Sequence, residues 1–389
     1  MYDIAVIGAG PAGVSSIFFS ASKGYKVIAF ERSPGFGAIC GEYLPAPDSL
    51  GLRGEVASNY FEFFRPFAAH RISRIRLEVF GREFGFCYEG YSIRRREMLK
   101  SRVQEAEGMG SRVLLKETFL GLKPEGGHYK IFTNKGRYEA KYVIGADGFP
   151  SKIAAILNSR NSVSCDDLSI AFPMEISLNL EDQGETRIII DEEIAPGAYS
   201  WIIPRGDSRA NVGLGARMSA YRGFNPFRAF GKLLKRIGVD MDIRAGDIKG
   251  RFVHVGGLSK VLARDGIFLV GDSAGMVVPS NGGGIFTAII SSYLLSISLE
   301  NEHPERDYTL SIAKYVRPLV ETGLIYRRAA DALMRLGILR RIVRLVPNSM
   351  VAEAITGNRG KYYRFLKLAS YLYPLSKSRG GSLPICERA

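Results

Sequence analysis

The stretch YDIAVIGAGPAGVSSIFFSASKGYKVIAFER, residues 2–32, decides the fold of this chain. Its apolar run at residues 4–7 is typical of a buried parallel strand, and three glycines in GxGxxG spacing follow directly. The pattern then predicts a helix to about Lys23 and a second strand that ends in Glu31. Such glycines let the backbone approach a pyrophosphate at the helix N-terminus, and the carboxylate can accept a hydrogen bond from a ribose hydroxyl. The stretch therefore predicts a dinucleotide-binding βαβ unit.

Two later segments favour FAD over NAD as the dinucleotide. YVIGADGFPSKIA places Asp147 and Gly148 after a buried strand, and GIFLVGDSAG places Gly271 and Asp272 after another. An aspartate in that position can hold the ribityl chain of a flavin. Three glycines at 282–284 then open a long helix, whose N-terminal amides and dipole would face the flavin N1–O2 edge.

Composition indicates a globular protein with more than one domain: 389 residues, 46% hydrophobic and 24% charged. The cysteines, Cys40, Cys87, Cys165 and Cys386, form no CxxC pair, so we expect neither a disulfide framework nor a zinc site, and a reducing cytoplasm fits best. Because the sequence starts directly on a strand, no signal peptide is expected, and the longest apolar stretch, residues 285–299, is short for a membrane span. The four histidines show no ligand spacing, and no metal is expected.

The net charge of +14 is concentrated near the C-terminus. From Glu305 onward there are 16 Lys or Arg and 6 Asp or Glu, a balance of +10. Nucleic acid and anionic membranes are the usual partners of such a surface, and no nucleic-acid module is recognisable, so nucleic acid is not expected. Residues 332–347 show helical periodicity, with Arg340, Arg341 and Arg344 on one narrow side. Two interpretations stay open: a core helix with a solvated basic stripe, or a helix at a membrane surface.

The region between the flavin segments has the pattern of a sheet. Strand-like runs separated by turn residues occupy residues 166–261. The segment at residues 92–108 predicts a helix that returns the chain to the flavin domain, and beyond about residue 310 the chain is expected to be helical.

The three flavin segments, in this order, resemble the glutathione-reductase-type FAD fold as it occurs in p-hydroxybenzoate-hydroxylase-like flavoproteins. The resemblance implies an α/β fold: a Rossmann-like FAD-binding domain, an inserted, mainly antiparallel β-sheet substrate domain, and a C-terminal helical region. The expected bounds are 1–165 with 262–310, then 166–261, then 311–389. Since only one dinucleotide fingerprint is present, an NADPH domain is not evident, and an external electron donor is expected, ferredoxin-like or another reduced carrier.

PGAYSWIIP, residues 196–204, holds the only tryptophan of the chain. With the GxG eight residues further on, it resembles a motif of the archaeal geranylgeranyl reductases, in which Ile203 stands where the family has Phe. CGEYLP and YSIRRREML resemble two further segments of that family, which implies that Cys40 and Gly41 lie near the flavin and that Arg95 meets its pyrophosphate. The matching residues of the PGAYSWIIP motif are Pro196, Tyr199, Trp201, Pro204, Gly213 and Gly215.

Fingerprint and resemblance together give the candidate site. The candidates for lining the substrate site or donating a proton are Cys40, Tyr199 and Trp201. The residues expected to hold FAD are Gly8, Gly10, Ala12, Gly13, Glu31, Arg32, Cys40, Gly41, Arg95, Asp147, Gly148, Gly271, Asp272, Gly282, Gly283, Gly284 and Ile285.

The resemblance implies an FAD-dependent oxidoreductase that saturates isolated C=C bonds of geranylgeranyl chains, using hydride from reduced flavin N5 and a proton. The substrate would be an archaeal-type ether lipid or its precursor, and large aromatics would shape an apolar tunnel for it. The plainer interpretation is that Tyr199 and Trp201 only pack a sheet and that Cys40 is a buried filler.

Other functions stay open. One is reduction of a quinone's prenyl tail. Another is an FAD-dependent monooxygenase or halogenase, because YSWIIP is one residue from a halogenase motif, although no lysine lies between Lys26 and Lys100. A non-enzymatic possibility is a flavin-binding protein docked at a membrane.

Overall fold

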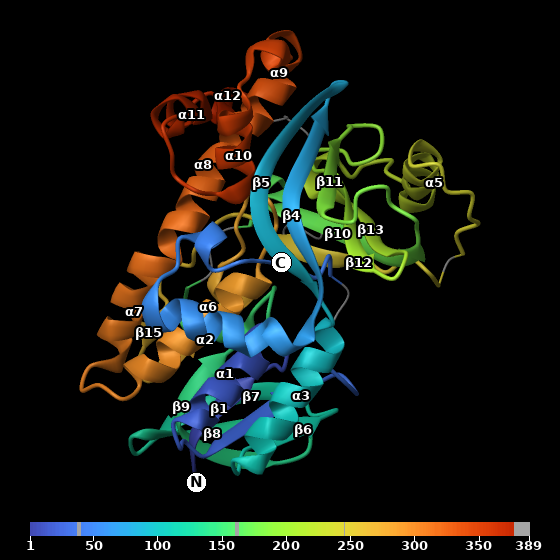
Figure 1. Cartoon of the computed structure of the whole chain (residues 1–389). Coiled ribbons are helices and arrows are strands. Elements are labelled where there is room, and N and C mark those ends of the chain that lie inside the picture. Colours follow the sequence, from blue (N-terminus) through green and yellow to red (C-terminus); the bar gives the residue numbers. More distant parts are fainter. Residues whose placement is uncertain (37–39, 160–162, 245, 377–389) are drawn as a thin grey trace.

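The computed structural model describes residues 1–36, 40–159, 163–244 and 246–376. Two β-sheets form its framework, one beside the N-terminus and one in the opposite half of the molecule, and helices from the last fifth of the chain lie against both (Figure 1).

The first sheet has the strand order β15-β16-β9-β1-β2-β6, with the hairpin of β7 and β8 attached to β9. β16, β9, β1, β2 and β6 run parallel to one another along this path, which confirms the predicted βαβ unit, whereas the short β15 at the edge pairs in antiparallel orientation. Helices α1 and α6 lie together on this sheet, where the Ser16 hydroxyl donates to the Ser292 hydroxyl at 2.9 Å. The bounds are β1 Tyr2–Ile7, α1 Pro11–Ser22, β2 Val27–Glu31, α3 Arg95–Gly108, β6 Arg112–Leu115, β7 Phe119–Glu125, β8 His128–Thr133, β9 Arg137–Gly145, α4 Lys152–Ile156, β15 Ala263–Arg264, β16 Ile267–Leu269 and α6 Ile285–Ser298.

The glycines of the fingerprint close the turn between β1 and α1. Gly8 has a φ of +98°, and a Cβ on Gly13 would lie 1.9 Å from the Gly8 carbonyl oxygen. Side chains at these two positions are therefore excluded by the backbone itself, whereas a Cβ on Gly10 would meet nothing within 4 Å. The turn is therefore closely packed at Gly8 and Gly13 and open at Gly10, which leaves room for a phosphate beside the backbone.

The second sheet has the order β14-β10-β13-β12-β11-β4-β5-β3 and is antiparallel except where β11 runs parallel to β4. One face packs against α5 through a buried cluster that includes Phe230 and Leu233. The bounds are β3 Tyr43–Pro45, α2 Gly54–Phe64, β4 Ala68–Val79, β5 Arg82–Ile93, β10 Leu168–Ser177, β11 Glu185–Ile190, β12 Ser200–Gly206, β13 Arg209–Arg217, α5 Pro226–Arg236 and β14 Arg251–His254.

This sheet draws on more of the chain than residues 166–261. Strands β3, β4 and β5 belong to it, although they lie within the segment 1–165 that was assigned to the FAD domain. The expected boundary therefore leaves three strands out. The reason is that β4 pairs with β11, more than a hundred residues away, and no local pattern reveals such a partner.

The C-terminal region is helical, as predicted, but the expected helix over residues 332–347 is broken. Gly337 has a φ of +68° and separates α8 from the five-residue α9, after which a 3₁₀ turn follows. Val343 and Val346 are buried against the β4–β5 hairpin, so much of the expected apolar arc is core. Across the described ranges, no helix combines the length and apolar character needed to span a bilayer. The bounds are α7 Pro304–Tyr315, α8 Arg317–Arg335, α9 Ile338–Ile342, α10 Asn348–Thr356, α11 Tyr363–Ser370 and α12 Tyr373–Ser376.

The cysteines differ in state. Cys40 and Cys87 are free thiols, whereas Cys165 is disulfide-bonded. Cys386 lies outside the described residues. One bonded cysteine is not the disulfide framework that the sequence argued against, but spacing along the sequence did not reveal that Cys165 is bonded.

Candidate functional site

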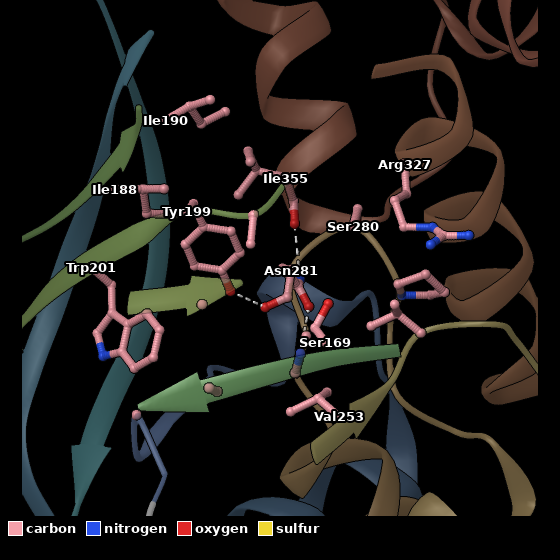
Figure 2. A pocket seen from close by; sticks show the side chains of 18 of the residues that line it. Ser169, Ile188, Ile190, Tyr199, Trp201, Val253, Ser280, Asn281, Arg327 and Ile355 are labelled. Carbon is pink, nitrogen blue, oxygen red and sulfur yellow. Dashed lines mark hydrogen bonds between the residues drawn. The ribbon is translucent and has the colours of Figure 1, made fainter. Parts of the chain in front are cut away.

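A cavity of about 800 Å³ lies where the two sheets and the C-terminal helices meet (Figure 2). One side is formed by the loops at residues 40–43 and 282–285, which belong to the FAD-type half of the molecule. The opposite wall is apolar and comes from β4, β5, β11 and β12 of the second sheet. Helices α8 and α9 complete the cavity on the side where Arg327 is seen in Figure 2.

The nucleotide fingerprint lies at the carboxyl end of β1, next to the cavity. Gly10 caps α1 without a side-chain hydrogen bond, so the N–H groups of the first turn remain available. The Glu31 carboxylate accepts hydrogen bonds from the backbone N–H groups of Ala9 and Ser33, both at 2.8 Å, and is thereby fixed at the end of β2. Arg32 beside it is exposed.

The two predicted aspartates have different surroundings. Asp147 accepts hydrogen bonds from the Ser151 hydroxyl at 2.7 Å and the Lys152 N–H at 2.6 Å, so its carboxylate holds the start of α4. Asp272 is partly buried, and its loss of solvation raises its pKa to about 6. Among the described residues, no donor meets its side chain, and its Oδ1 faces Gly284, where a Cβ would lie 2.9 Å away.

A salt-bridge cluster holds the loop that contains Cys40. Glu42 pairs with Arg205 at 2.5 Å and lies 3.5 Å from the Nε of Arg95, which is buried and donates to no acceptor in the described structure. Burial raises the pKa of the Cys40 thiol, and the positive charge of Arg95 opposes this only in part. Cys40 is therefore a neutral thiol near pH 7.

Tyr199, Trp201 and Ile203 all line the cavity from one face of the sheet. The Tyr199 and Trp201 ring centroids lie 6.0 Å apart, and the indole covers Gly213 on the neighbouring strand. A Cβ on Gly213 would lie 2.2 Å from the indole Cζ2. Gly213, which follows the tryptophan motif in the sequence, therefore provides the space that the Trp201 indole occupies. The spacing of the motif alone does not show this contact.

Asn281 connects three parts of the molecule, and the sequence reasoning did not single it out. Its carbonyl accepts the Tyr199 hydroxyl, its side-chain amide donates to the Ile355 carbonyl at 2.9 Å, and its Oδ1 accepts from the Gly283 N–H at 2.8 Å (Figure 2). The available signal was an asparagine directly before three glycines, a pattern typical of a turn that is fixed by side-chain hydrogen bonds. Burial also raises the pKa of Tyr199, whose proton is held by Asn281.

A second feature that the sequence did not reveal is the ionic end of the cavity. Arg327 pairs with Asp167 at 2.5 Å, and Arg217 lies 3.6 Å from Asp331. Burial lowers the pKa of Arg217, but not enough to discharge a guanidinium. These groups join the second sheet to α8 and leave the cavity apolar at one end and polar at the other.

The structure therefore brings the predicted residues into two adjoining groups. Cys40, Gly41, Tyr199, Trp201 and the segment 282–285 line the cavity. The remaining members lie along the carboxyl ends of the first sheet or on α1 and α3, and a Cβ on Gly271 would lie 2.7 Å from that of Ala12. The roles assigned to these residues stay predictions.

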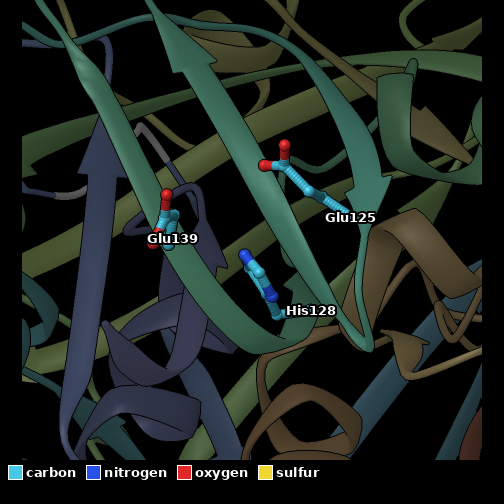
Figure 3. Close-up of side chains that lie close together, drawn as sticks. All are labelled: Glu125, His128 and Glu139. Atoms are coloured by element: carbon cyan, nitrogen blue, oxygen red, sulfur yellow. The ribbon is translucent and has the colours of Figure 1, made fainter.

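An acidic group with one histidine lies away from the cavity, on β7, β8 and β9. Glu125, His128 and Glu139 bring ligand atoms within 4.8 Å of one another, with the imidazole between the carboxylates (Figure 3). Glu125 also pairs with Lys130 at 2.6 Å, which lowers the pKa of its carboxyl and occupies one oxygen. The sequence assigned no metal ligands, and this proximity alone does not assign them.

Chemically, the group of residues along the carboxyl ends of the first sheet and on α1 and α3 fits a ligand that carries hydroxyl donors and phosphates. Open space in front of Gly10, the partly buried Asp272 carboxylate without a donor and the buried Nε of Arg95 without an acceptor each match one part of such a ligand. The cavity beside it fits a long apolar substrate with one polar end.

Comparison with known proteins identifies relatives of this chain. Residues 167–243 match the family model of the geranylgeranyl reductase catalytic domain. The chain is 30% identical over 305 residues to digeranylgeranylglycerophospholipid reductase 1 of Methanopyrus kandleri, covering 74% of this chain and 78% of that protein. It is 28% identical over 302 residues to the digeranylgeranylglycerophospholipid reductase of Methanocaldococcus jannaschii, covering 74% of each.

Solved structures confirm the predicted fold. A geranylgeranyl bacteriochlorophyll reductase-like protein from Thermoplasma acidophilum superposes with a TM-score of 0.71 at 22% identity, over 96% of this chain and 97% of that one. A flavin-dependent brominase superposes with a TM-score of 0.68 at 16% identity, over 97% and 100% of the two chains, and this likeness concerns the fold alone. Similarity to the curated reductases over three quarters of both chains, with the matched catalytic domain forming one wall of the cavity, shows that this chain belongs to the geranylgeranyl reductase family of oxidoreductases.

Proposed function

We propose that the chain binds FAD and saturates the isolated C=C bonds of geranylgeranyl chains in archaeal-type ether phospholipids or their precursors. The observation that carries this proposal is the cavity, which joins the loops at 40–43 and 282–285 to an apolar wall on the second sheet. When bound, FAD supplies hydride from its reduced N5. The dinucleotide fingerprint, Arg95 and Asp272 are the residues that would hold it, since their unmatched polar atoms fit its phosphates and hydroxyls.

The chain's own side chains have separate tasks in this reaction. The walls formed by Ile188, Tyr199 and Trp201 exclude water and keep an isoprenoid extended. Delivery of the proton falls to Cys40 Sγ, because its thiol is neutral and lies at the cavity surface. Tyr199 serves as wall, since its hydroxyl proton is committed to the Asn281 carbonyl.

The function is tested by anaerobic incubation of the holoprotein, yellow as purified and bleached by chemical reduction, with a digeranylgeranyl phospholipid, followed by mass analysis. A mass gain of one hydrogen molecule per double bond supports the proposal. An oxygenated or halogenated product in air, or a colourless protein that cannot be reconstituted with FAD, contradicts it. Because the chain has one dinucleotide fingerprint, we propose an external reduced carrier as electron donor, and rapid anaerobic bleaching by NADPH would contradict that part.

Removal of the Cys40 thiol separates its role from packing. In Cys40→Ala we expect turnover to fall about tenfold, less than the full contribution of a positioned acid because water can replace part of the proton delivery. Flavin retention should not change. Cys87→Ala is the matched control, since Cys87 is also a free thiol but is exposed on β5. Equal turnover of the two variants would show that Cys40 is a filler.

We also infer that the outer end of the cavity docks on a membrane, at the inner face of the cell membrane. Phe80 at the tip of the β4–β5 hairpin lines the cavity and is 42% exposed, and the Arg340 guanidinium lies 5.9 Å from its ring. Leu336 and Leu345 are 46% and 82% exposed on either side of α9. Together with Arg341 and Arg344, these side chains place apolar groups beside cations around the opening, at the end of the molecule away from the N-terminus (Figure 1).

Vesicle flotation tests this surface. The parent protein should float with phosphatidylglycerol vesicles and bind phosphatidylcholine vesicles weakly, because anionic headgroups attract the arginines. Leu345→Asp should reduce flotation about tenfold. Leu120→Asp is the control, since Leu120 is 58% exposed on β7 in the other half of the molecule. Equal flotation of both variants would contradict the proposed surface.

A further inference from the structure

A buried side-chain amide links the loop of Cys40 to the indole of Trp201. Asn211 lies on β13 and is 6% exposed. Its Oδ1 accepts the indole N–H of Trp201 at 2.8 Å, and its Nδ2 donates to the Cys40 carbonyl at 2.9 Å. Both ends of the amide are therefore engaged, one toward the substrate wall and the other toward the flavin-side loop, so its orientation is fixed by its partners.

The same place shows direct packing between the two parts. A Cβ on Gly41 would lie 3.3 Å from Ile203 Cδ1 and 3.6 Å from Trp201 Nε1, so the loop backbone lies flat against these two side chains. Asn211 shares its face of β13 with Gly213, the seat of the indole. The indole thus has its ring covering Gly213 and its only polar atom bonded to Asn211.

We propose that Asn211 is a positioning residue: it fixes the Cys40 loop and the Trp201 indole in one mutual geometry, and so sets where the thiol meets the substrate alkene. The kinetic part of this inference rests on the proposed function, whereas the geometric part does not.

In its form near neutral pH, no other residue of similar size supplies both bonds. Alanine would leave a buried indole N–H and a buried carbonyl unpaired, which is costly at each group. An ionised aspartate would accept from the indole but would set a negative charge against the Cys40 carbonyl and close to Glu42 and Glu175, whose shared partner is Arg205. A protonated aspartate, in contrast, carries one donor and one acceptor and reproduces the pattern of the amide.

Asn211→Asp in the FAD-loaded protein therefore has a signature that loss of packing would not produce. At pH 8 we expect kcat to fall roughly tenfold to a hundredfold, the scale of a misplacement of about 1 Å, with a smaller change in KM. On acidification, kcat of the variant relative to the parent should rise as the carboxyl becomes neutral. Asn211→Ala should lose activity at every pH.

Two readouts do not depend on turnover. Trp201 is the only tryptophan, so its fluorescence reports the indole alone, and its emission should shift in both variants. Alkylation of Cys40 in a Cys87→Ala background should become faster. Asn179→Ala is the control, since Asn179 is an exposed residue of the same half of the molecule that accepts one surface hydrogen bond. Unchanged emission and alkylation in Asn211→Asp would overturn the inference, whereas shifts in both with no reductase activity in the parent would contradict only the proposed function.

Discussion

Gly213→Ala is expected to reduce alkene reduction by more than about a hundredfold while FAD remains bound. The new Cβ would lie 2.2 Å from Trp201 Cζ2 and 2.8 Å from the Phe172 carbonyl oxygen. Neither the strand backbone nor the buried indole can move by an ångström unless the surrounding side chains repack. Such overpacking typically lowers the free energy of unfolding by about 1–3 kcal/mol. The indole is the more mobile of the two, so it should move into the cavity and block the substrate path.

The measurement combines anaerobic kcat/KM with tryptophan emission and thermal unfolding of the FAD-loaded protein. Gly121→Ala on β7 is the control for adding a methyl group to a strand glycine, since a Cβ there meets nothing within 4 Å. Gly213→Ala combined with Trp201→Phe should recover part of the lost stability, because phenylalanine lacks the indole atoms that collide, while the contact with the Phe172 carbonyl remains, and such coupling is expected of residues in contact. Parent-like turnover in Gly213→Ala would show that the indole position is irrelevant to the reaction.

Asp272→Asn is expected to have opposite effects on the apoprotein and the holoprotein. Burial raises the pKa of Asp272 from its ordinary 3.8 to about 6, so deprotonation is less favourable in the folded chain than in the unfolded one. The unfolded state therefore releases its proton first, and stability is lost as the pH rises through the window from 3.8 to about 6. The loss at neutral pH amounts to about 3 kcal/mol.

The asparagine carries no charge to bury, so the variant apoprotein should unfold at a higher temperature than the parent at pH 7, and the difference should vanish near pH 4. FAD binding should weaken roughly tenfold to a hundredfold, because a hydrogen bond to a charged acceptor is replaced by a neutral one. Asp265→Asn is the control, since Asp265 is an exposed aspartate in the same half of the molecule. Equal unfolding temperatures of the parent and variant apoproteins at both pH values would contradict the predicted cost of the Asp272 charge. Unchanged FAD affinity would remove Asp272 from the flavin site.

Short-range patterns were sufficient for the βαβ unit at the start of the first sheet. The apolar run of β1, the glycines and the helix α1 lie within one stretch, and each local preference agrees with the final packing. Strands β10 to β13 could also be predicted from the sequence, because turn residues separate them and apolar residues recur at every second position along β10 and β13. The family motif likewise located Tyr199 and Trp201 on a common face, and both line the cavity.

The relations between distant segments could not be read in this way. Three examples are the pairing of β4 with β11, the contact of the indole with Gly213 and the hydrogen bond of Asn211 to Cys40. Each depends on the register between strands or on a loop that lies far away along the chain. A one-residue change of register would turn Asn211 to the other face of the sheet, with little change in local propensity. A linear pattern specifies which side chains are available and which face they share, and the packing of the whole chain specifies what they touch.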